Sequence, residues 1–233
     1  MTAQEKPTAK GVVDTNPATG TAVAELSETN LDALPQMLAK AREAQAIWAA
    51  KSFKERARHI QMMRSYIVDR ADDLARTVSE SNGKTLTDAL ATEVLPCALA
   101  CKWYAKNAEH YLKERNRPAG SILFFNKRTH MLRVPRGVVG IISPWNYPLS
   151  IPFGEIVMAL MAGNGVMLKV AAATPAVGRA IEQIVAAGEL PQGLFQHIVG
   201  SGSKVATGFF DNGIDKLFFT GSVPAGKTLM GQA

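Results

Sequence analysis

The sequence has 233 residues, 47% of them hydrophobic and 20% charged, which argues against extensive disorder and allows a sizeable core. The net charge of +6 comes from dispersed basic residues without a recognition motif, so nucleic-acid binding is not expected. The most apolar stretch, residues 156–168, is short and interrupted by Gly163 and Gly165, and the amino terminus lacks an apolar signal segment. We therefore expect a soluble cytoplasmic protein without a membrane partner.

The first part of the chain predicts a β-hairpin followed by helices. Residues 11–26 read as two short strands around the turn-forming run Asn16-Pro17-Ala18-Thr19-Gly20. Asn30 can cap a helix in which apolar side chains recur at helical spacing as far as Trp48. Further helices are predicted over residues 54–69, over residues 72–82 with a stop at Gly83, and over residues 87–115.

Both cysteines fall in the last of these helices, which Pro96 is expected to start or kink. Cys97 and Cys101 are four residues apart, so they share a helix face where a disulfide would be strained. No histidine or second cysteine pair stands at the spacing of zinc ligands, and no metal site is predicted. The simplest interpretation is two semi-buried, reduced thiols.

The second part of the chain predicts a parallel sheet. Residues 121–126 and 129–135 first read as a pair of strands. From Gly137 onward, short apolar strands alternate with helices, as in sheets covered by helices on both faces. The expected strands are residues 138–143, 165–169, 195–199 and 216–219, and the expected helices are residues 151–162, 175–187, 204–210 and 223 onward.

Each candidate motif lies where one of these strands ends, which is where ligands bind in such sheets. The first is Ser143-Pro144-Trp145-Asn146-Tyr147-Pro148, in which two prolines hold Asn146 on a rigid loop. An amide fixed in this way could stabilise a developing oxyanion. Asparagine is also an ordinary turn residue, so a purely structural role remains an alternative.

The next two strand ends give weaker signals. Lys169 ends the second strand, where it could reach a ribose hydroxyl or a phosphate, or simply extend to solvent. Gly200-Ser201-Gly202-Ser203 follows the third strand, but Val205 occupies the third glycine position of a dinucleotide fingerprint. A standard pyrophosphate loop is therefore not predicted there.

The fourth strand end is Phe219-Thr220-Gly221-Ser222. Glycine permits close approach of a ligand to the backbone, and Ser222 begins a helix whose free N–H groups favour a phosphate. Ser222 can also act only as the helix cap, and the two roles are compatible.

Together these motifs resemble the aldehyde dehydrogenase superfamily. The residues that carry the resemblance are Gly137-Val-Val-Gly-Ile-Ile-Ser-Pro-Trp-Asn-Tyr-Pro-Leu149, Ala162-Gly163-Asn164, Lys169, Gly200-Ser201-Gly202 and Phe219-Thr-Gly-Ser222. The Pro-Trp-Asn run combined with the downstream Phe-Thr-Gly-Ser run is highly specific. The likeness extends from Gly11 to the end of the chain, but over only about the first half of a family member.

The resemblance implies an α/β fold: a variant Rossmann doubly wound parallel sheet preceded by an amino-terminal helical segment. It also implies NAD or NADP as cofactor, an aldehyde as substrate and a homodimer or homotetramer as assembly. Asn146 is similar to the family's catalytic oxyanion-hole amide, and Lys169 to the residue that contacts the adenosine ribose. The other residues expected at the cofactor are Ile142, Ser143, Pro144, Trp145, Ala172, Gly202, Gly221 and Ser222.

Two departures from the family pattern bear on function. The family's nucleophilic cysteine and general-base glutamate lie downstream of Phe-Thr-Gly-Ser, beyond Ala233, so the chain is expected to be truncated and inactive alone. Ala172 stands where many NAD-preferring members have a glutamate, which suggests tolerance of NADP. Alternatives are an acyl-phosphate or acyl-CoA reductase relative, which would be expected to lack the Trp145-Asn146 pair, or a non-catalytic nucleotide-binding polypeptide.

The resemblance also divides the chain into regions. Residues 1–117 are expected to form a hairpin and helices that pack on the cofactor domain. Residues 118–136 are expected to supply strands of the oligomerisation region, and residues 137–233 an incomplete cofactor domain. The segment between Asn212 and Ser222 is similar to that of some succinate-semialdehyde dehydrogenases, and this likeness suggests a semialdehyde as the substrate.

Overall fold

The computed structural model describes residues 11–118 and 120–233. It begins with an antiparallel hairpin of β1 (Gly11–Thr15) and β2 (Ala22–Ser27), as predicted. The turn between the strands forms because Asn16 Oδ1 accepts hydrogen bonds from the backbone N–H groups of Ala18 and Thr19. A short 3-10 turn over Leu31–Ala33 follows, capped by Asn30.

A series of helices comes next: α1 (Leu34–Ala49), α2 (Phe53–Asp69), α3 (Ala71–Asn82), α4 (Leu86–Ala89), a π-helical turn (Leu90–Val94) and α5 (Leu95–Leu112). Their boundaries follow local chemistry. Ser52 and Glu55 form a reciprocal capping box at the start of α2. Gly83 ends α3 with a left-handed φ of 83°, which confirms the predicted stop. Pro96 lies in the first turn of α5, directly after the π-helical turn, where the helical hydrogen-bond pattern changes.

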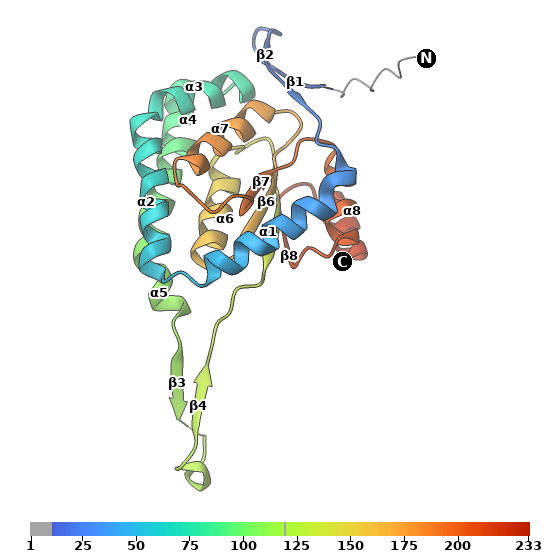
Figure 1. The fold of residues 1–233 in the computed structure, drawn as a ribbon. Coiled ribbons are helices and arrows are strands. Elements are labelled where there is room, and N and C mark those ends of the chain that lie inside the picture. Colours follow the sequence, from blue (N-terminus) through green and yellow to red (C-terminus); the bar gives the residue numbers. More distant parts are fainter. Residues whose placement is uncertain (1–10, 119) are drawn as a thin grey trace.

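The segment after α5 differs from the prediction. The paired strands are β3 (Arg115–Pro118) and β4 (Arg128–Met131), whereas Ile122–Phe124 form a 3-10 turn at the tip. The predicted pairing of residues 121–126 with 129–135 was therefore wrong, as was the extension of the helix to Arg115. The apolar run at the tip is exposed, so its hydrophobicity did not signal a buried strand. Figure 1 shows this hairpin extending away from the rest of the molecule.

The remaining elements alternate as predicted. The strands are β5 (Val138–Ile142), β6 (Gly165–Lys169), β7 (Phe195–His197) and β8 (Lys216–Phe219), and the helices are α6 (Ser150–Met161), α7 (Pro175–Ala186), α8 (Gly202–Asp211) and α9 (Val223–Gln232). The strands form a parallel sheet in the order β7-β6-β5-β8. Because β8 lies on the opposite side of β5 from β6, the strand order reverses at β5, the position where open α/β sheets bind ligands.

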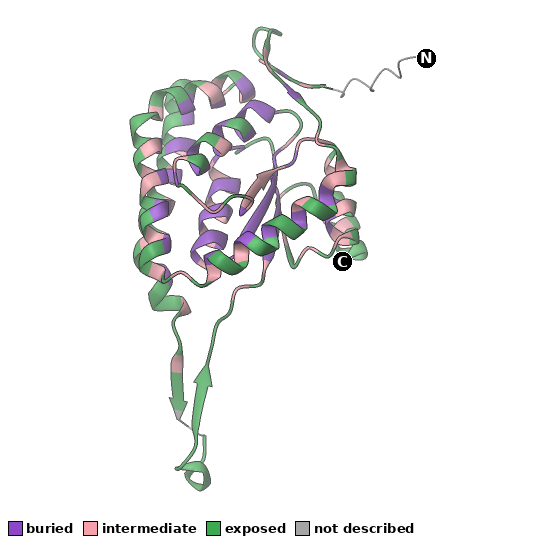
Figure 2. Cartoon of the chain, viewed as in Figure 1, coloured by how far each residue is buried: buried purple, intermediate pink, exposed green. Residues whose placement is uncertain are grey.

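Alternating side chains of the sheet enter two hydrophobic clusters. Val139, Ile141 and Leu168 point into the larger cluster, with residues of α6 and α7. Val138, Ile142 and Met167, on the other face, pack with residues of α1 and α8. Helices α2, α3 and α5 pack outside α6 and α7 as a further layer, and the buried residues gather between these layers (Figures 1 and 2). The sheet is therefore covered on both faces, and its loops are left to form the site.

Candidate functional site

A cavity of about 850 Å³ lies beyond the carboxyl ends of β5, β6 and β8. All of the residues predicted from the sequence to bind cofactor or stabilise an oxyanion line it: Ile142, Ser143, Pro144, Trp145, Asn146, Lys169, Ala172, Gly202, Gly221 and Ser222. They come from four separate strand ends and helix starts. The cavity also takes residues that the sequence did not single out, among them Thr228 and Leu229 of α9.

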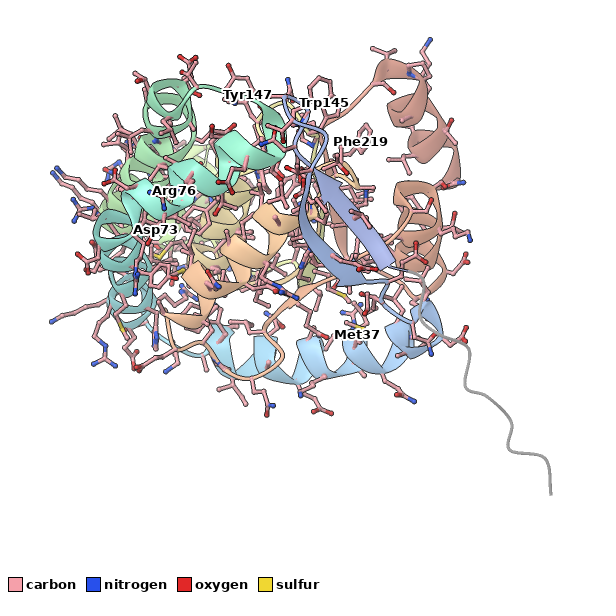
Figure 3. All side chains as sticks on the ribbon, turned by 90° about the horizontal axis from the view of Figure 1, so that it is seen from above. Met37, Asp73, Arg76, Trp145, Tyr147 and Phe219 are labelled. Carbon is pink, nitrogen blue, oxygen red and sulfur yellow. The ribbon has the colours of Figure 1, made fainter. Side chains whose placement is uncertain are left out.

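The loop after β5 carries the most distinctive chemistry. Trp145, Asn146 and Tyr147 are exposed, whereas Pro148 and Leu149 are buried and hold the end of the loop. Asn146 Oδ1 accepts a hydrogen bond of 3.1 Å from the Tyr147 backbone N–H. No described residue accepts a hydrogen bond from the Asn146 amide nitrogen, so both of its N–H groups are available to a ligand oxygen. Figure 3 shows Trp145, Tyr147 and Phe219 along one edge of the molecule.

Three residues that sequence reasoning missed hold this loop from outside. Asn82, at the end of α3, donates a hydrogen bond of 2.7 Å to the Trp145 carbonyl. Glu93, in the π-helical turn, is fully buried and accepts hydrogen bonds from the backbone N–H groups of Leu149 and Ser150 at 3.1 and 2.8 Å. Its carboxylate thus occupies the positive amino-terminal end of α6.

Lys84 completes this anchor. Its ammonium group pairs with Glu93 and lies 3.8 Å from the centre of the Tyr147 ring. A buried carboxylate requires such a partner, because an isolated charge in the interior costs several kcal/mol. The sequence gives no usable signal for this anchor, because the π-helical turn, a feature that is frequent at functional sites, is not evident from it.

Lys169 is the cationic residue among the described residues that line the cavity. The side chain is only 6% exposed, and burial lowers the pKa of its ammonium group. Its Nζ lies 3.3 Å from the position that a Cβ on Gly202 would take. Glycine at the first residue of α8 therefore lets Lys169 approach the start of that helix. Among the described residues that line the cavity there is no Asp or Glu, and hence no protein carboxylate faces Lys169 there.

The loop after β8 forms the opposite wall. The Phe219 ring folds over Gly221, where a Cβ would lie 2.5 Å from the ring. Ser222 Oγ accepts a hydrogen bond of 3.4 Å from the Ala225 backbone N–H and caps α9. The predicted cap is confirmed. Two helices of ten residues, α8 and α9, thus begin at one cavity, and their unpaired N–H groups make it suited to an anion.

The cavity fits a dinucleotide in size and in donors. Its volume is within the range of sites for cofactors. The Ser143 hydroxyl is buried without a partner among the described residues, and the Ala171–Ala173 segment leaves an uncharged wall near Lys169. Residues for holding phosphates and ribose hydroxyls are therefore present, although the three-glycine fingerprint is not.

The two cysteines lie elsewhere. Both are buried on α5 and neither lines the cavity. Burial raises the pKa of Cys97 well above its usual value and that of Cys101 to about 12, so both thiols stay protonated and unreactive at neutral pH. Among the described residues, no group of His, Cys, Asp and Glu could hold a metal ion, and no helix is long and apolar enough to cross a membrane.

Comparison with known proteins agrees with this site. The sequence model of the aldehyde dehydrogenase family matches residues 3–233. The chain belongs to that family. One curated relative is the 4,4'-diapolycopene aldehyde oxidase of Methylomonas sp, which is 34% identical to this chain over 200 residues. The match covers 86% of this chain and 38% of the relative.

Solved aldehyde dehydrogenases share the fold closely. The succinate-semialdehyde dehydrogenase of Burkholderia pseudomallei superimposes with a TM-score of 0.89 at 28% identity, over 96% of this chain and 45% of that one. Aldehyde dehydrogenase C of Pseudomonas syringae, solved with NAD+ and octanal, gives a TM-score of 0.87 at 28% identity, over 100% and 46%. The present chain spans less than half the length of each of these relatives.

Proposed function

We propose that this chain binds NAD or NADP as the cofactor-binding part of an aldehyde dehydrogenase that oxidises an aldehyde to a carboxylic acid. The observation that carries the proposal is the single cavity in which two helix amino termini, the buried Lys169 and the Asn146 amide converge. When bound, the nicotinamide cofactor accepts a hydride from the substrate. The named relatives differ in their aldehydes, so the proposal extends only to aldehydes as a class.

Each residue has a definite task in this proposal. The N–H groups at the starts of α8 and α9 bind the pyrophosphate, and Lys169 binds the ribose hydroxyls. Gly202 and Gly221 permit the close approach. The Asn146 amide donates a hydrogen bond to the carbonyl oxygen of the substrate as negative charge develops on it. Ile142, Ser143, Pro144 and Trp145 line the cavity next to Asn146 and would contact the cofactor.

Direct nucleotide binding tests the proposal. The 233-residue protein should bind NADPH saturably, measured by enhancement of nucleotide fluorescence. Lys169→Met should weaken binding by about tenfold or more, the scale of a lost charge-assisted contact. Lys204→Met is the matched control, because Lys204 is an exposed lysine on α8 outside the cavity. Absence of saturable binding, or equal losses in both variants, would contradict the proposal.

The choice between NAD and NADP is proposed to depend on Ala172. With no carboxylate among the described residues lining the cavity, nothing there repels the 2′-phosphate of NADP. The wild type should therefore bind NADP at least as well as NAD. Ala172→Glu should shift the affinity ratio toward NAD by about 1–3 kcal/mol, through a new ribose contact and charge repulsion. Affinities for both nucleotides, before and after the change, measure this. A wild type strongly selective for NAD, with a ratio unmoved by the glutamate, would place Ala172 away from the ribose.

We also propose that residues 1–233 alone do not oxidise aldehydes. Covalent catalysis needs a reactive thiolate, and the thiols of Cys97 and Cys101 are buried, protonated and outside the cavity. Aldehyde-dependent NADPH formation by this polypeptide should stay at background. A signal abolished by Cys97→Ser or Cys101→Ser would overturn this part of the proposal.

Three further features remain proposals. We infer a cytoplasmic location, and assembly of the full-length parent protein as a homodimer or homotetramer with the region of residues 118–136 in its interface. We also infer that residues 1–117 support a cofactor domain formed by residues 137–233. The exposed apolar tip of the β3–β4 hairpin supports the assembly, and the packing of α1 and α2 on β6 and α6 supports the division.

A further inference from the structure

Arg56 is buried and forms no ion pair with any described residue. The residue, on α2, is 5% exposed, and its Nε has no hydrogen-bond partner among the described residues. Its guanidinium group lies 4.6 Å from the centre of the Phe53 ring, a contact that compensates only part of the lost hydration. Burial lowers the pKa of Arg56, yet arginine stays charged in proteins. Buried charges in proteins are generally paired, so a bound anion would compensate the charge that remains on Arg56.

Arg56 lines a second cavity, of about 310 Å³, at the base of the β3–β4 hairpin. The cavity lies between the α1–α2 connection, the end of α5 and residues 132–135, which precede β5. It is therefore near the amino ends of the sheet strands, whereas the candidate cofactor cavity lies beyond their carboxyl ends. The two share no lining residue.

The charges around this second cavity are mostly positive. Lys51, Lys113 and Arg133 line it together with Arg56. The one carboxylate among the described residues that line it is Glu114, and its Oε1 lies 2.6 Å from His130 Nδ1, outside the cavity. Glu55, next to Arg56 on α2, raises the pKa of Arg56 and offsets part of its charge, but its carboxylate is held in the capping box with Ser52 and forms no ion pair with Arg56. No carboxylate within the described chain is thus paired with Arg56.

We propose that this cavity binds a small oxyanion of the phosphate or carboxylate class. The planar guanidinium group of Arg56 would take two oxygens of the anion, and the three other cations would attract it from solvent. The volume is at the lower end for ligand sites, so it suits a single phosphate or a small carboxylate and not a dinucleotide. Because the cavity walls come from both ends of the hairpin, the bound anion would also fix where the hairpin leaves the body.

Titration with inorganic phosphate and, separately, with acetate tests the proposal. Binding to the 233-residue protein is measured by calorimetry at constant ionic strength, since phosphate also stabilises proteins non-specifically. We expect one saturable site for at least one of the two anions. The anion that binds more tightly identifies the preferred class. Arg56→Met should lose at least about tenfold in affinity, and Arg56→Lys should retain part of it, because lysine keeps the charge but not the two-pronged geometry.

Exposed variants keep the test valid if Arg56→Met fails to fold. Lys113→Gln combined with Arg133→Gln removes two rim charges from exposed positions and should weaken binding several-fold. Lys54→Gln combined with Arg58→Gln removes the same charge from α2 outside the cavity and should leave affinity within about twofold. Absence of saturable binding of both anions, or equal losses in the two double variants, would overturn the proposal. Neither result would affect NADPH binding at the other cavity, so the two proposals fail separately.

Discussion

The Asn146 loop and the tip of the β3–β4 hairpin both expose aromatic and apolar side chains, but they are held in different ways. Trp145 is 62% exposed and Phe125 is 86% exposed. The Trp145 carbonyl and the backbone following Tyr147 are fixed by Asn82 and Glu93, which come from other elements. Among the described residues, the hydrogen bonds of the hairpin tip lie within its own turn, such as that from the Leu123 N–H to Ser121 Oγ.

This difference separates two kinds of exposed surface. A loop whose backbone is fixed while its side chains face a cavity is preorganised, so a ligand that binds it loses little conformational entropy. An exposed apolar tip without such anchors is typical of a surface that is covered by another chain. Exposure alone did not distinguish the two surfaces, whereas the hydrogen-bond partners of the backbone did.

The largest effect is expected from removing the anchor of the Asn146 loop. Glu93→Ala leaves two backbone N–H groups and the Lys84 ammonium group without their buried partner. We expect a loss of about 2–4 kcal/mol in the free energy of unfolding, measured by urea denaturation, and weaker NADPH binding. Glu93→Gln, which keeps an acceptor for the N–H groups, should lose less.

Asp73 offers a matched control for that substitution. Its carboxylate pairs with both Arg70 and Arg76 on the surface of α3, far more exposed than Glu93. Asp73→Ala should cost less than about 1 kcal/mol and leave NADPH binding unchanged. Equal losses of stability and of NADPH binding in the two variants would show that Glu93 does not anchor the Asn146 loop.

An intermediate effect is expected from Glu155, which lies on α6 just beyond the anchored turn. Its Oε2 is buried without a partner among the described residues, and burial raises the pKa of this carboxyl from 4.5 to about 7. The folded state therefore keeps a proton that the unfolded state releases. The stabilisation by the protonated Glu155 carboxyl is therefore fully present below pH 4.5. The free energy of unfolding then falls as the pH rises from 4.5 through about 7.

Glu155→Gln should remove this pH dependence. Because the side chain is partly exposed, we expect a gain of only about 1–2 kcal/mol at pH 8 and almost none at pH 4. Urea denaturation of both proteins across this pH range measures the difference. A variant that was equally stabilised at both pH values would show that ionisation of Glu155 is not the cause.

The smallest effect on stability is expected at the hairpin tip. Phe125→Ser should change the free energy of unfolding by less than about 0.5 kcal/mol, because the side chain has little packing to lose. The same change should reduce concentration-dependent association, measured by sedimentation velocity. Val68→Ser, at an exposed valine of α2, is the control and should leave association unchanged. Equal association of all three proteins would remove the tip from the assembly surface.

The sequence was most informative from Val138 to Phe219, where short apolar strands alternate with helices. This order predicted the parallel sheet, and parallel strands bring their carboxyl ends to one edge. Asn146, Lys169, Gly202 and Ser222 could therefore be placed at one site. Their roles as ligand contacts were suggested by their chemistry at the strand ends, were made specific by the family resemblance, and stay predictions.

Other features depend on contacts that no local pattern encodes. Glu93 reads as an ordinary helix residue, because its partners Leu149 and Ser150 are more than fifty positions away along the chain. Arg56 reads as one more basic residue of an amphipathic helix, and only the fold shows that it is buried. The hairpin strands were misplaced because Arg115–Pro118 is polar, whereas strand prediction relies on apolar alternation.

The position of β8 has a consequence for how the protein folds. Strand β5 pairs with β6 after one helical connection, but it pairs with β8 only after β6, α7, β7 and α8 have intervened. The contact between the Val138 N–H and Asp215, for example, spans 77 positions. Closing this loop costs more entropy than closing the β5–β6 connection, so we expect β8 to dock after β6 in the folding reaction. The walls of the candidate cofactor cavity would meet only at that step. A bound nucleotide should therefore slow unfolding and leave the folding rate almost unchanged.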